Sequence, residues 1–412
     1  MEYGLIGEHL GHSHSQQIHE CLSNYTYELH PLMPQELEGF IRRADYRGIN
    51  VTIPYKKAVI SFLDNLSSEA ERIGSVNTIV CVEGKLQGHN TDYHGFALMA
   101  KRAGISFAGR KVLVLGTGGT SATAQAVVAD GGAADIVAVS RGGDVDYHNV
   151  YQQHDAEIII NTTPVGMYPN NAGRILEPQR FPNLMGVLDV IYNPLRTNLV
   201  LDAQKLGIKA SGGLPMLVYQ AVFASELFTR KKVDHALSES VISQMFQQLQ
   251  NIVLIGMPGS GKTTLAQNLA KKMGRECIDI DACVIEKAGL PIPEIFAQQG
   301  EAEFRALEHD SVAHAAQSAG VVIATGGGTV LDPENMQALM QNGRVYYLSC
   351  DTDKLCMDDR PLSRGIPALE ELYRGRHPLY MAYSDARIDR NANSLADLVA
   401  AIEEDFHEAS GH

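Results

Sequence analysis

The sequence lacks any hydrophobic run long enough to cross a membrane. No stretch approaches the roughly 18–20 consecutive apolar residues that a membrane-spanning helix requires. The chain opens on a strand-like segment, Tyr3–Ile6, and no charged segment followed by a long apolar run precedes it. We therefore expect a soluble, cytoplasmic protein without a membrane partner.

The sequence also lacks paired cysteines and a basic charge. Its six cysteines are scattered and form neither a Cys-x-x-Cys pair nor a Cys/His cluster with zinc-ligand spacing, so we expect reduced thiols. The formal net charge of −14 argues against a nucleic-acid-binding protein, which needs a clustered basic face. Sequence repeats and low-complexity tracts are absent as well, so the chain has the features of ordinary globular domains.

What the sequence has is a regular alternation of short apolar runs with amphipathic segments. This alternation is typical of α/β folds with parallel sheets, and the 412 residues suggest about two to four domains. The strands predicted in the first half are Tyr3–Gly7, Gly48–Ile53, Val76–Val82, Lys111–Leu115, Ile136–Ser140, Glu157–Asn161, Gly186–Val190 and Ile208–Ser211. The helices predicted there are Ser15–Ser23, Pro34–Arg43, Ser67–Ile73, Ala122–Ala129, Pro215–Leu227 and Val233–Gln250.

The strongest motif begins the second half. Residues Gly256–Thr263 fit the P-loop pattern G-x-x-x-x-G-K-[ST] at every fixed position, between a predicted strand, Ile252–Ile255, and a predicted helix, Thr264–Lys272. The backbone N–H groups of such a loop hold phosphates, the lysine (Lys262) reaches the terminal phosphates, and the threonine hydroxyl (Thr263) binds Mg²⁺. The motif predicts a nucleotide site but does not identify the acceptor.

Charged residues downstream could complete a phosphoryl-transfer site. Asp279 and Asp281 follow a strand-like segment, and alternate residues of a strand point the same way, so both carboxylates would face the phosphates; two solvated acids are the alternative. Arg305 lies among acids in a predicted helix, either as a surface ion pair or as a fixed partner for a substrate carboxylate. Glycines 326–328 follow a buried strand and permit close approach of a ligand. Four arginines could form a mobile phosphate-covering segment or an ordinary solvated loop: Arg360, Arg364, Arg374 and Arg376.

Together these residues resemble the shikimate kinase family over essentially all of 251–412. The matching elements are the P-loop, the Asp279/Asp281 pair, Ile292–Phe296, Gly300–Glu308, the triple glycine, Arg360–Leu362, Arg376 and Pro378–Tyr380. The resemblance implies that Asp279 and Thr263 bind Mg²⁺ and that Asp281 and Lys262 are catalytic. It implies that shikimate is bound by Arg305, Gly327, Gly328 and Arg376. It implies that ATP is bound by Gly259, Ser260, Gly261, Thr263, Thr264 and Arg360. The segment 358–376 looks short for a lid of this family.

A second glycine-rich turn lies in the first half. Gly116–Ala122 follows the predicted strand Lys111–Leu115 and precedes a helical segment, a context that predicts a dinucleotide site. The next predicted strand ends at Ser140 and Arg141. An acid there would bind the ribose of NAD, whereas an arginine suits the 2′-phosphate of NADP. Arg141 therefore favours NADP, although the nearby Asp144 weakens the preference.

Polar residues at the ends of predicted strands form a further set. They are Ser13, Ser15, Asn50, Thr52, Lys56, Asn77, Thr78, Asn90, Thr91 and Asp92. Any one of them could serve as a cap or a turn residue. As a set they could converge on one crevice that holds a polyhydroxy acid.

This set closely resembles the shikimate dehydrogenase family over nearly all of residues 1–230. The matching stretches are Ser13–Ser15, Asn50–Lys56, Gly74–Thr78, Asn90–Asp92, Asn161–Met167, Tyr192–Pro194 and Gly213–Gln220. The resemblance implies that Lys56 and Asp92 form the catalytic pair. It implies that the substrate is bound by Ser13, Ser15, Thr52, Asn77, Asp92, Tyr192 and Gln220. It implies that NADP is bound by Gly116, Gly118, Gly119, Thr120, Ser140, Arg141, Thr162, Gly213 and Met216. The chemistry agrees, because hydride delivery to a ketone builds alkoxide charge that an ammonium can stabilise and protonate.

The two resemblances name consecutive reactions of aromatic amino-acid (chorismate) biosynthesis: reduction of 3-dehydroshikimate with NADPH, then phosphorylation of shikimate with MgATP. They imply an α/β substrate domain formed by 1–97 and 213–248 and a Rossmann-type NADP domain over 98–212. They also imply a P-loop domain over 251–412, similar to nucleoside-monophosphate kinases and built on a parallel sheet. Three alternatives stay open: a first half acting on quinate with NAD, one half being a non-catalytic sensing module, and a kinase for another small acid such as gluconate.

Overall fold

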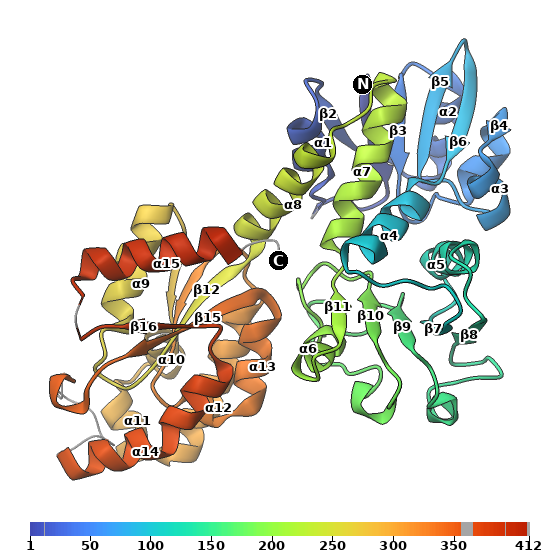
Figure 1. Cartoon of the computed structure of the whole chain (residues 1–412). Coiled ribbons are helices and arrows are strands. Elements are labelled where there is room, and N and C mark those ends of the chain that lie inside the picture. The colour runs from blue at the N-terminus through green and yellow to red at the C-terminus, as the bar shows by residue number, and fades with distance from the viewer. Residues whose placement is uncertain (12, 356–365, 392, 410–412) are drawn as a thin grey trace. The chain divides into compact units, whose positions relative to one another are not determined.

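The computed structural model describes residues 1–11, 13–355, 366–391 and 393–409, and these form two compact units. The first unit comprises Met1–Gly166, Arg174–Tyr192 and Leu199–Ser243. The second comprises Met167–Gly173, Asn193–Asn198 and Gln244–His412. Three sheets of mostly parallel strands run through the chain (Figure 1), so the α/β fold predicted from the sequence is confirmed.

The first sheet belongs to the N-terminal part of the first unit. Its strand order is β2 (Tyr27–Pro31), β1 (Tyr3–Gly7), β3 (Gly48–Val51), β5 (Thr78–Val82), β6 (Lys85–His89) and β4 (Asn65–Leu66). β1 is parallel to β2 and β3, whereas β5 is antiparallel to β3 and β6. The helices of this part are α1 (Ser15–Leu22), α2 (Leu37–Arg43), α3 (Ser68–Ile73), α4 (Thr91–Arg102) and α7 (Leu214–Thr229). Helix α8 (His235–Leu249) begins in the first unit and belongs to the second from Gln244 on.

Side-chain alternation along the strands separates the two faces of this sheet. Ile49 and Ile79 are buried on the face that packs against α2, and Val80 is buried on the face that packs against Phe228 of α7. Figure 1 shows α4 and α7 side by side, next to this sheet. The two faces therefore have separate hydrophobic cores.

The second sheet of the first unit is entirely parallel. Its order is β11 (Lys209–Ser211), β10 (Gly186–Asp189), β9 (Ile158–Asn161), β7 (Lys111–Leu115) and β8 (Asp135–Val139), with helices α5 (Gly119–Asp130) and α6 (Asn198–Lys205). β7 lies between β8 and β9, so the strand order reverses there. Such a switch point opens a crevice at the carboxyl ends of the strands, where open α/β sheets bind their ligands.

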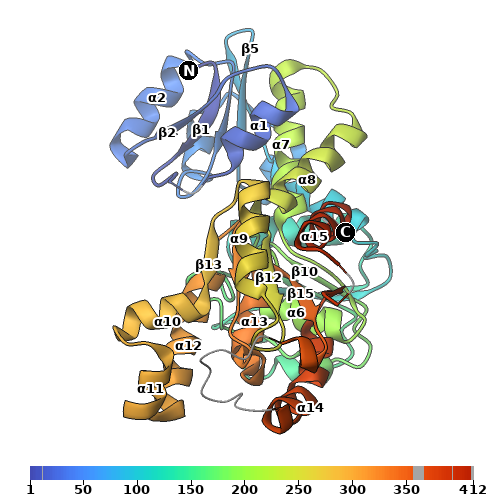
Figure 2. The same ribbon diagram turned by 90° about the vertical axis from the view of Figure 1, so that its left-hand side faces the viewer.

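The third sheet forms the core of the second unit and is also parallel. Its order is β13 (Cys277–Asp279), β14 (Val322–Ala324), β12 (Asn251–Ile255), β15 (Gly343–Ser349) and β16 (Ala386–Asp389). The helices are α9 (Lys262–Met273), α10 (Ile280–Ala288), α11 (Ile292–Gln298), α12 (Gly300–Ala316), α13 (Pro333–Asn342), α14 (Ile366–Tyr383) and α15 (Leu395–Ala409). α9 and α15 cover one face, and α12, α13 and α14 cover the other. In Figure 2, α10 and α11 lie beside α12.

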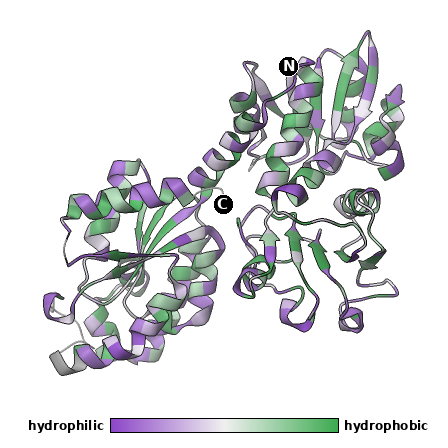
Figure 3. Cartoon of the chain, in the orientation of Figure 1, coloured by the Kyte–Doolittle hydropathy of each residue, from purple (hydrophilic) through white to green (hydrophobic). Residues whose placement is uncertain are grey.

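Short 3₁₀ turns complete the fold. They are η1 (Pro34–Glu36), η2 (Ala58–Phe62), η3 (Val150–Gln153), η4 (Pro178–Arg180), η5 (Thr329–Leu331) and η6 (Thr352–Lys354). Figure 3 shows that the central strands are hydrophobic, as expected for sheets covered on both faces. Within the described residues, none of the helices combines the length and apolarity needed to span a membrane.

Two sequence expectations differ from the structure. Arg374 and Arg376 were expected in a loop-like covering segment, but both lie in the regular helix α14; Arg360 and Arg364 lie outside the described residues. Strands β2, β4 and β6 of the first sheet were not predicted, because polar residues interrupt their apolar pattern, and β15 and β16 of the third sheet were not predicted either. Their pairing within the sheet outweighs this weak local signal.

Candidate active sites

A cavity of about 420 Å³ in the first unit collects the predicted substrate residues. Its lining includes Ser13, Ser15, Thr52, Lys56, Asn77, Asp92, Tyr192 and Gln220. Three residues of the predicted NADP set line the same cavity: Thr120, Gly213 and Met216. Residues far apart in sequence therefore meet at one place, which lies at the ends of strands of the first sheet and at the starts of helices.

Lys56 and Asp92 are in direct contact in this cavity. The Lys56 Nζ lies 2.7 Å from Asp92 Oδ2, and the two side chains are 27% and 14% exposed. Lys56 follows strand β3, and Asp92 lies in the first turn of α4, whose N-cap Asn90 accepts a hydrogen bond from the Tyr93 N–H. The positive end of the helix dipole favours the carboxylate at this position. The pair is thus held at the cavity surface with its charges still accessible.

A buried hydrogen-bond network fixes the neighbouring wall. The Thr91 N–H donates to Asn77 Oδ1 at 2.7 Å, and the Asn77 amide donates to the Thr91 hydroxyl at 3.0 Å. Asn50 accepts from the Tyr27 hydroxyl at 2.7 Å and donates to the Thr78 hydroxyl at 2.9 Å. Of the two asparagines that precede a threonine in the predicted polar set, Asn90 acts as a helix cap, whereas Asn77 both supports the wall and lines the cavity.

The glycine turn after β7 suits a dinucleotide. Helix α5 begins at Gly119, and a Cβ added at Gly118 would meet no atom within 4 Å, so there is open space at this helix N-terminus. Thr162 lies across the switch point, with its hydroxyl donating to the Leu115 carbonyl at 2.6 Å. Ser140 and Arg141 follow the neighbouring strand β8. These residues fit the pyrophosphate and ribose ends of a bound dinucleotide.

Arg141 is exposed and available for a phosphate. No ion pair joins it to Asp144 or to another acid among the described residues. The nearby acid therefore does not neutralise the guanidinium in this structure. An unpaired arginine at this position suits the 2′-phosphate of NADP.

The P-loop of the second unit has the geometry of a phosphate cradle. Lys262 is buried, and its Nζ donates to the carbonyls of Gly256 and Met257 at 2.9 and 3.0 Å. Gly261 has φ +92°, a left-handed conformation that glycine adopts without strain. The Ser260 Oγ is buried without a hydrogen-bond partner among the described residues. A bound phosphate oxygen would satisfy that hydroxyl, so the loop fits a nucleotide.

The predicted metal pair is also assembled. The Thr263 hydroxyl donates to Asp279 Oδ2 at 2.6 Å, and the other oxygen of Asp279 accepts from the Ala282 N–H as the N-cap of α10. The reason given for Asp281 was wrong, however, because β13 ends at Asp279 and Asp281 lies in the first turn of α10. Asp281 nevertheless faces the glycine loop: a Cβ added at Gly326 would lie 2.9 Å from its Oδ1.

Arg305 is fixed by two acids of its own helix. Its guanidinium donates to Glu308 at 2.6 Å and to Glu301 at 3.2 Å, and Glu308 is buried and also accepts from the Thr329 hydroxyl. A Cβ added at Gly328 would collide with the Arg305 guanidinium, so a larger residue there would displace the guanidinium from this position. These contacts favour a held arginine over a plain surface ion pair.

Helix α14 brings Arg376 near the triple glycine. Arg376 is buried, and Tyr380 on the next turn donates to the Gly327 carbonyl at 2.6 Å. Burial raises the pKa of Tyr380, while the Arg376 guanidinium acts in the opposite direction. Arg360, the remaining predicted nucleotide residue, lies outside the described residues.

The structure adds residues that sequence reasoning missed. A cavity of about 390 Å³ extends from Ser260, Gly261 and Thr264 to Arg390 and Asn393. The Arg390 guanidinium donates to the Gly259 carbonyl at 3.5 Å. The signal available in the sequence was a polar segment directly after a strand, Arg390–Asn393, but nothing in its pattern linked it to the P-loop.

Comparison with known proteins places this geometry in a family. A shikimate dehydrogenase (NADP⁺) from Clostridium perfringens (strain SM101 / Type A) is 37% identical to this chain over 264 residues, covering 59% of the chain and 97% of the relative. The chain belongs to the shikimate dehydrogenase family. Residues 5–79 also match the family model of the shikimate dehydrogenase substrate binding domain.

Solved structures share the fold of this shikimate dehydrogenase part. A shikimate 5-dehydrogenase from Thermus thermophilus, in complex with NADP(H) and shikimate, is 29% identical with a TM-score of 0.53, covering 58% of this chain and 98% of that one. A quinate dehydrogenase from Corynebacterium glutamicum, in complex with NAD, is 26% identical with a TM-score of 0.54, covering 59% and 99%. Solved structures of this fold thus include one with NADP(H) and shikimate bound and one with NAD bound.

The remainder of the chain matches another enzyme family. Residues 258–406 match the family model of shikimate kinase. The resemblance predicted for each half from its motifs is therefore confirmed. The two matches together describe an enzyme that joins a shikimate dehydrogenase to a shikimate kinase in one polypeptide.

Proposed function

We propose that the chain catalyses two consecutive reactions: NADPH-dependent reduction of 3-dehydroshikimate to shikimate, and MgATP-dependent phosphorylation of shikimate to shikimate 3-phosphate. The observation that carries the first reaction is the 2.7 Å Lys56–Asp92 contact inside a cavity lined by hydroxyl and amide side chains. The second rests on Arg305, held by Glu308 beside the triple glycine and close to the P-loop.

The first site reduces a ketone. NADPH, held by the glycine turn and Arg141, supplies the hydride. The Lys56 ammonium gives its proton to the oxygen on which negative charge develops, and Asp92 orients that ammonium. The substrate is held by Ser13, Ser15, Thr52, Asn77, Tyr192 and Gln220.

The second site transfers a phosphoryl group. Thr263 and Asp279 hold Mg²⁺ with the nucleotide, and Lys262 stabilises charge on the transferred phosphate. Asp281 orients the acceptor hydroxyl. Arg305 and Arg376 bind the carboxylate of shikimate, with Gly327 and Gly328 allowing close approach.

The domain assignment belongs to the same proposal. We assign 1–97 and 213–248 to substrate binding, 98–212 to NADP binding and 251–412 to the kinase. A cytoplasmic location stays a prediction from the sequence.

The decisive experiment follows both reactions in one vessel. The purified chain is given 3-dehydroshikimate, NADPH and MgATP, and NADPH loss and product identity are recorded together. The proposal predicts NADPH consumption ending in shikimate 3-phosphate. Shikimate that accumulates unphosphorylated would contradict the kinase assignment. If NADPH is not consumed while added shikimate is phosphorylated, the dehydrogenase assignment is contradicted.

The same assay separates the main alternative. One related structure is a quinate dehydrogenase in complex with NAD. Turnover is therefore compared for shikimate and quinate, each with NADP⁺ and with NAD⁺. Unpaired Arg141 favours NADP⁺, and an Arg141→Ser variant should raise the KM for NADP⁺ about tenfold while leaving that for NAD⁺ nearly unchanged. Faster turnover of quinate with NAD⁺ would replace the first half of the proposal.

A further inference from the structure

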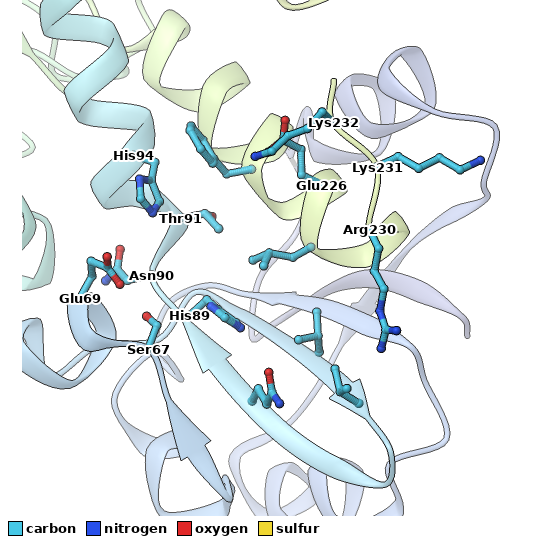
Figure 4. Close-up of a pocket in the computed structure, with 15 residues that line it drawn as sticks. Ser67, Glu69, His89, Asn90, Thr91, His94, Glu226, Arg230, Lys231 and Lys232 are labelled. Atoms are coloured by element: carbon cyan, nitrogen blue, oxygen red, sulfur yellow. The ribbon is translucent and has the colours of Figure 1, made fainter. Parts of the chain in front are cut away.

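The first unit contains a second cavity, whose lining shares only Asn90 and Thr91 with the polar residues singled out in the sequence and none with the lining of the cavity around Lys56 and Asp92. Its volume is about 660 Å³, larger than the 420 Å³ of the cavity around Lys56 and Asp92. It lies over the β5–β6 hairpin and is bounded by the starts of α3 and α4, the end of α7 and the residues that follow α7 (Figure 4). A cavity of this size can enclose a small organic molecule.

One wall of this cavity is apolar and partly aromatic. Val80 and Val82 of β5 line it together with Phe223 and Leu227 of α7. The Phe223 ring stacks on the imidazole of His94, with ring centroids 4.5 Å apart and planes 24° from parallel. Apolar side chains next to stacked rings favour a flat aromatic ligand over a flexible polar one.

The mouth of the cavity carries an uncompensated positive charge. Arg230 ends α7 in a left-handed conformation (φ +56°), and within the described part of the chain no ion pair involves its guanidinium. The neighbouring Lys232 is neutralised by Glu226 at 2.6 Å, and Figure 4 shows that the side chain of Lys231 points away. Arg230 is therefore the group that would attract an anion.

The acid on the opposite side does not cancel this charge. Glu69 lies at the start of α3, where its carboxylate accepts hydrogen bonds from its own backbone N–H and from the hydroxyls of Ser67 and Ser68. These hydrogen bonds lower the pKa of Glu69 and hold its charge at the helix N-terminus. Figure 4 shows Glu69 on the far side of the cavity from Arg230.

The imidazole of His89 lines the far end of the cavity, with its Nε2 on the buried side of the ring. The Nε2 of His89 is buried and has no hydrogen-bond partner among the described residues, a state that costs free energy until a partner arrives. Burial lowers the pKa values of His89 and His94, so both rings are neutral at pH 7. A ligand hydroxyl can donate to or accept from a neutral imidazole, and therefore suits either tautomer.

We propose that this cavity binds a hydroxylated aromatic carboxylate. Its carboxylate pairs with Arg230, its ring packs between the β5 valines and the Phe223–His94 stack, and its hydroxyl meets His89. Figure 4 shows Arg230 and His89 at opposite sides of the hairpin, as a ligand with polar groups at both ends of a ring requires.

The test measures binding heat on the full chain, with 4-hydroxybenzoate as the probe. Its uncharged analogue 4-hydroxybenzamide should bind about tenfold more weakly or worse, because the charge-assisted contact is lost. The variant Arg230→Asn should lower affinity for 4-hydroxybenzoate about tenfold, and asparagine tolerates the left-handed backbone there. The matched control is Arg43→Asn, which removes an exposed arginine from α2 on the other face of the sheet and should bind like the unaltered chain.

His89 is tested separately. In His89→Phe, affinity for 4-hydroxybenzoate should fall several-fold while affinity for benzoate, which has no hydroxyl, stays the same. No binding of 4-hydroxybenzoate up to about 10 mM, or equal affinity in Arg230→Asn and Arg43→Asn, would overturn the proposal.

Titration with shikimate shows whether the probe occupies a different site. If the apparent Kd of 4-hydroxybenzoate rises without limit as shikimate is added, both ligands share one site and the inference fails. If the Kd of 4-hydroxybenzoate does not change, or rises only to a plateau as shikimate is added, the two ligands bind at separate sites. The measurement needs no turnover, so it stands or falls independently of the two proposed reactions.

Discussion

In the first unit, the Lys56 ammonium and the Asp92 carboxylate contact each other at 2.7 Å and both remain partly open to the cavity. In the second unit, Lys262 is only 7% exposed and donates to two backbone carbonyls, and Arg305 is held between Glu301 and the buried Glu308. Reactive charges are therefore paired with each other in one site and with supporting groups in the other.

The difference matches the two proposed reactions. Ketone reduction needs a proton that can leave the ammonium, so the lysine has one acidic partner and an open side toward the substrate. Phosphoryl transfer requires positive charge placed in advance around phosphate and carboxylate, with little movement during the reaction. Backbone carbonyls hold Lys262 and acidic side chains hold Arg305, so these positive charges are in place before the reaction.

Removal of divalent metal should separate the two sites most strongly. With excess EDTA, we expect phosphorylation to fall to the detection limit, because Thr263 and Asp279 bind the nucleotide through Mg²⁺. Dehydrogenase turnover should not change, since none of its proposed steps uses a metal. Both rates are measured on one preparation, and Mg²⁺ is then added back. A parallel loss of both activities would break the comparison.

The second-largest effect on activity is expected from replacing the lysine of the first site. Lys56→Ala should lower dehydrogenase kcat by roughly 10²–10⁴-fold, the usual range for a missing general acid, with the kinase rate unchanged. Lys57→Ala is the matched control, because Lys57 is the adjacent, exposed lysine. Retention of most of the activity in Lys56→Ala would show that another group supplies the proton.

A conservative change in the second site tests the importance of rigid support. Arg305→Lys keeps the charge but loses the two-pronged geometry held by Glu301 and Glu308, so the KM for shikimate in the kinase reaction should rise about 10–100-fold. The KM for ATP should stay the same. Arg374→Lys, an exposed arginine of α14, provides the control. Equal behaviour of the two variants would mean that Arg305 is only a surface ion pair.

The smallest effect concerns acid stability and again distinguishes the units. Burial lowers the pKa of His19, in the first unit, to about 3, below the usual value of about 6.5 for an unfolded chain. Between these values the unfolded state binds the extra proton, so folding stability falls as pH drops below about 6.5. The loss is about 1.4 kcal/mol per pH unit, or about 2 kcal/mol at pH 5.

Hydrogen exchange of peptides from each unit at pH 7 and pH 5 measures this effect, since the chain has no tryptophan to report unfolding. His19→Gln should flatten the pH dependence of the first unit. His309→Gln serves as the comparison in the second unit, where the hydrogen bond to Asp332 raises the pKa of a partly exposed histidine, so acid should stabilise slightly rather than destabilise. If the stability of the first unit depends on pH in His19→Gln as it does in the unaltered chain, the buried His19 is not the cause of that dependence.

Much of both sites was predictable from sequence because the signals are local. A P-loop needs its glycines, lysine and threonine in consecutive positions, and the strand–turn–helix context around Gly118 is equally compact. Asp281 was expected to face the phosphates together with Asp279 by strand alternation, but the strand ends at Asp279 and Asp281 lies in the first turn of α10. Local periodicity predicts that a strand is present better than it predicts the residue at which it ends.

Other features depended on contacts between distant residues. Arg390 reaches the P-loop from 131 positions away, and Phe223 stacks on His94 from another helix. Neither pairing has a spacing or a pattern in the sequence. The cavity over the β5–β6 hairpin is of the same kind, because its lining comes from two strands, three helices and a segment after α7.

The sequence by itself determined the α/β class, most strands of the first unit, the two phosphate-binding turns and the families that the two halves resemble, since each depends on residues close together along the chain. Tertiary structure decided that the Lys56 ammonium and the Asp92 carboxylate close to 2.7 Å, that Arg305 lies against Gly328, and that Arg230 lines a cavity without an ion-pair partner among the described residues. The physical reason is that distances and burial between remote residues are set by packing of helices on sheets, and side-chain charges act over only a few ångströms.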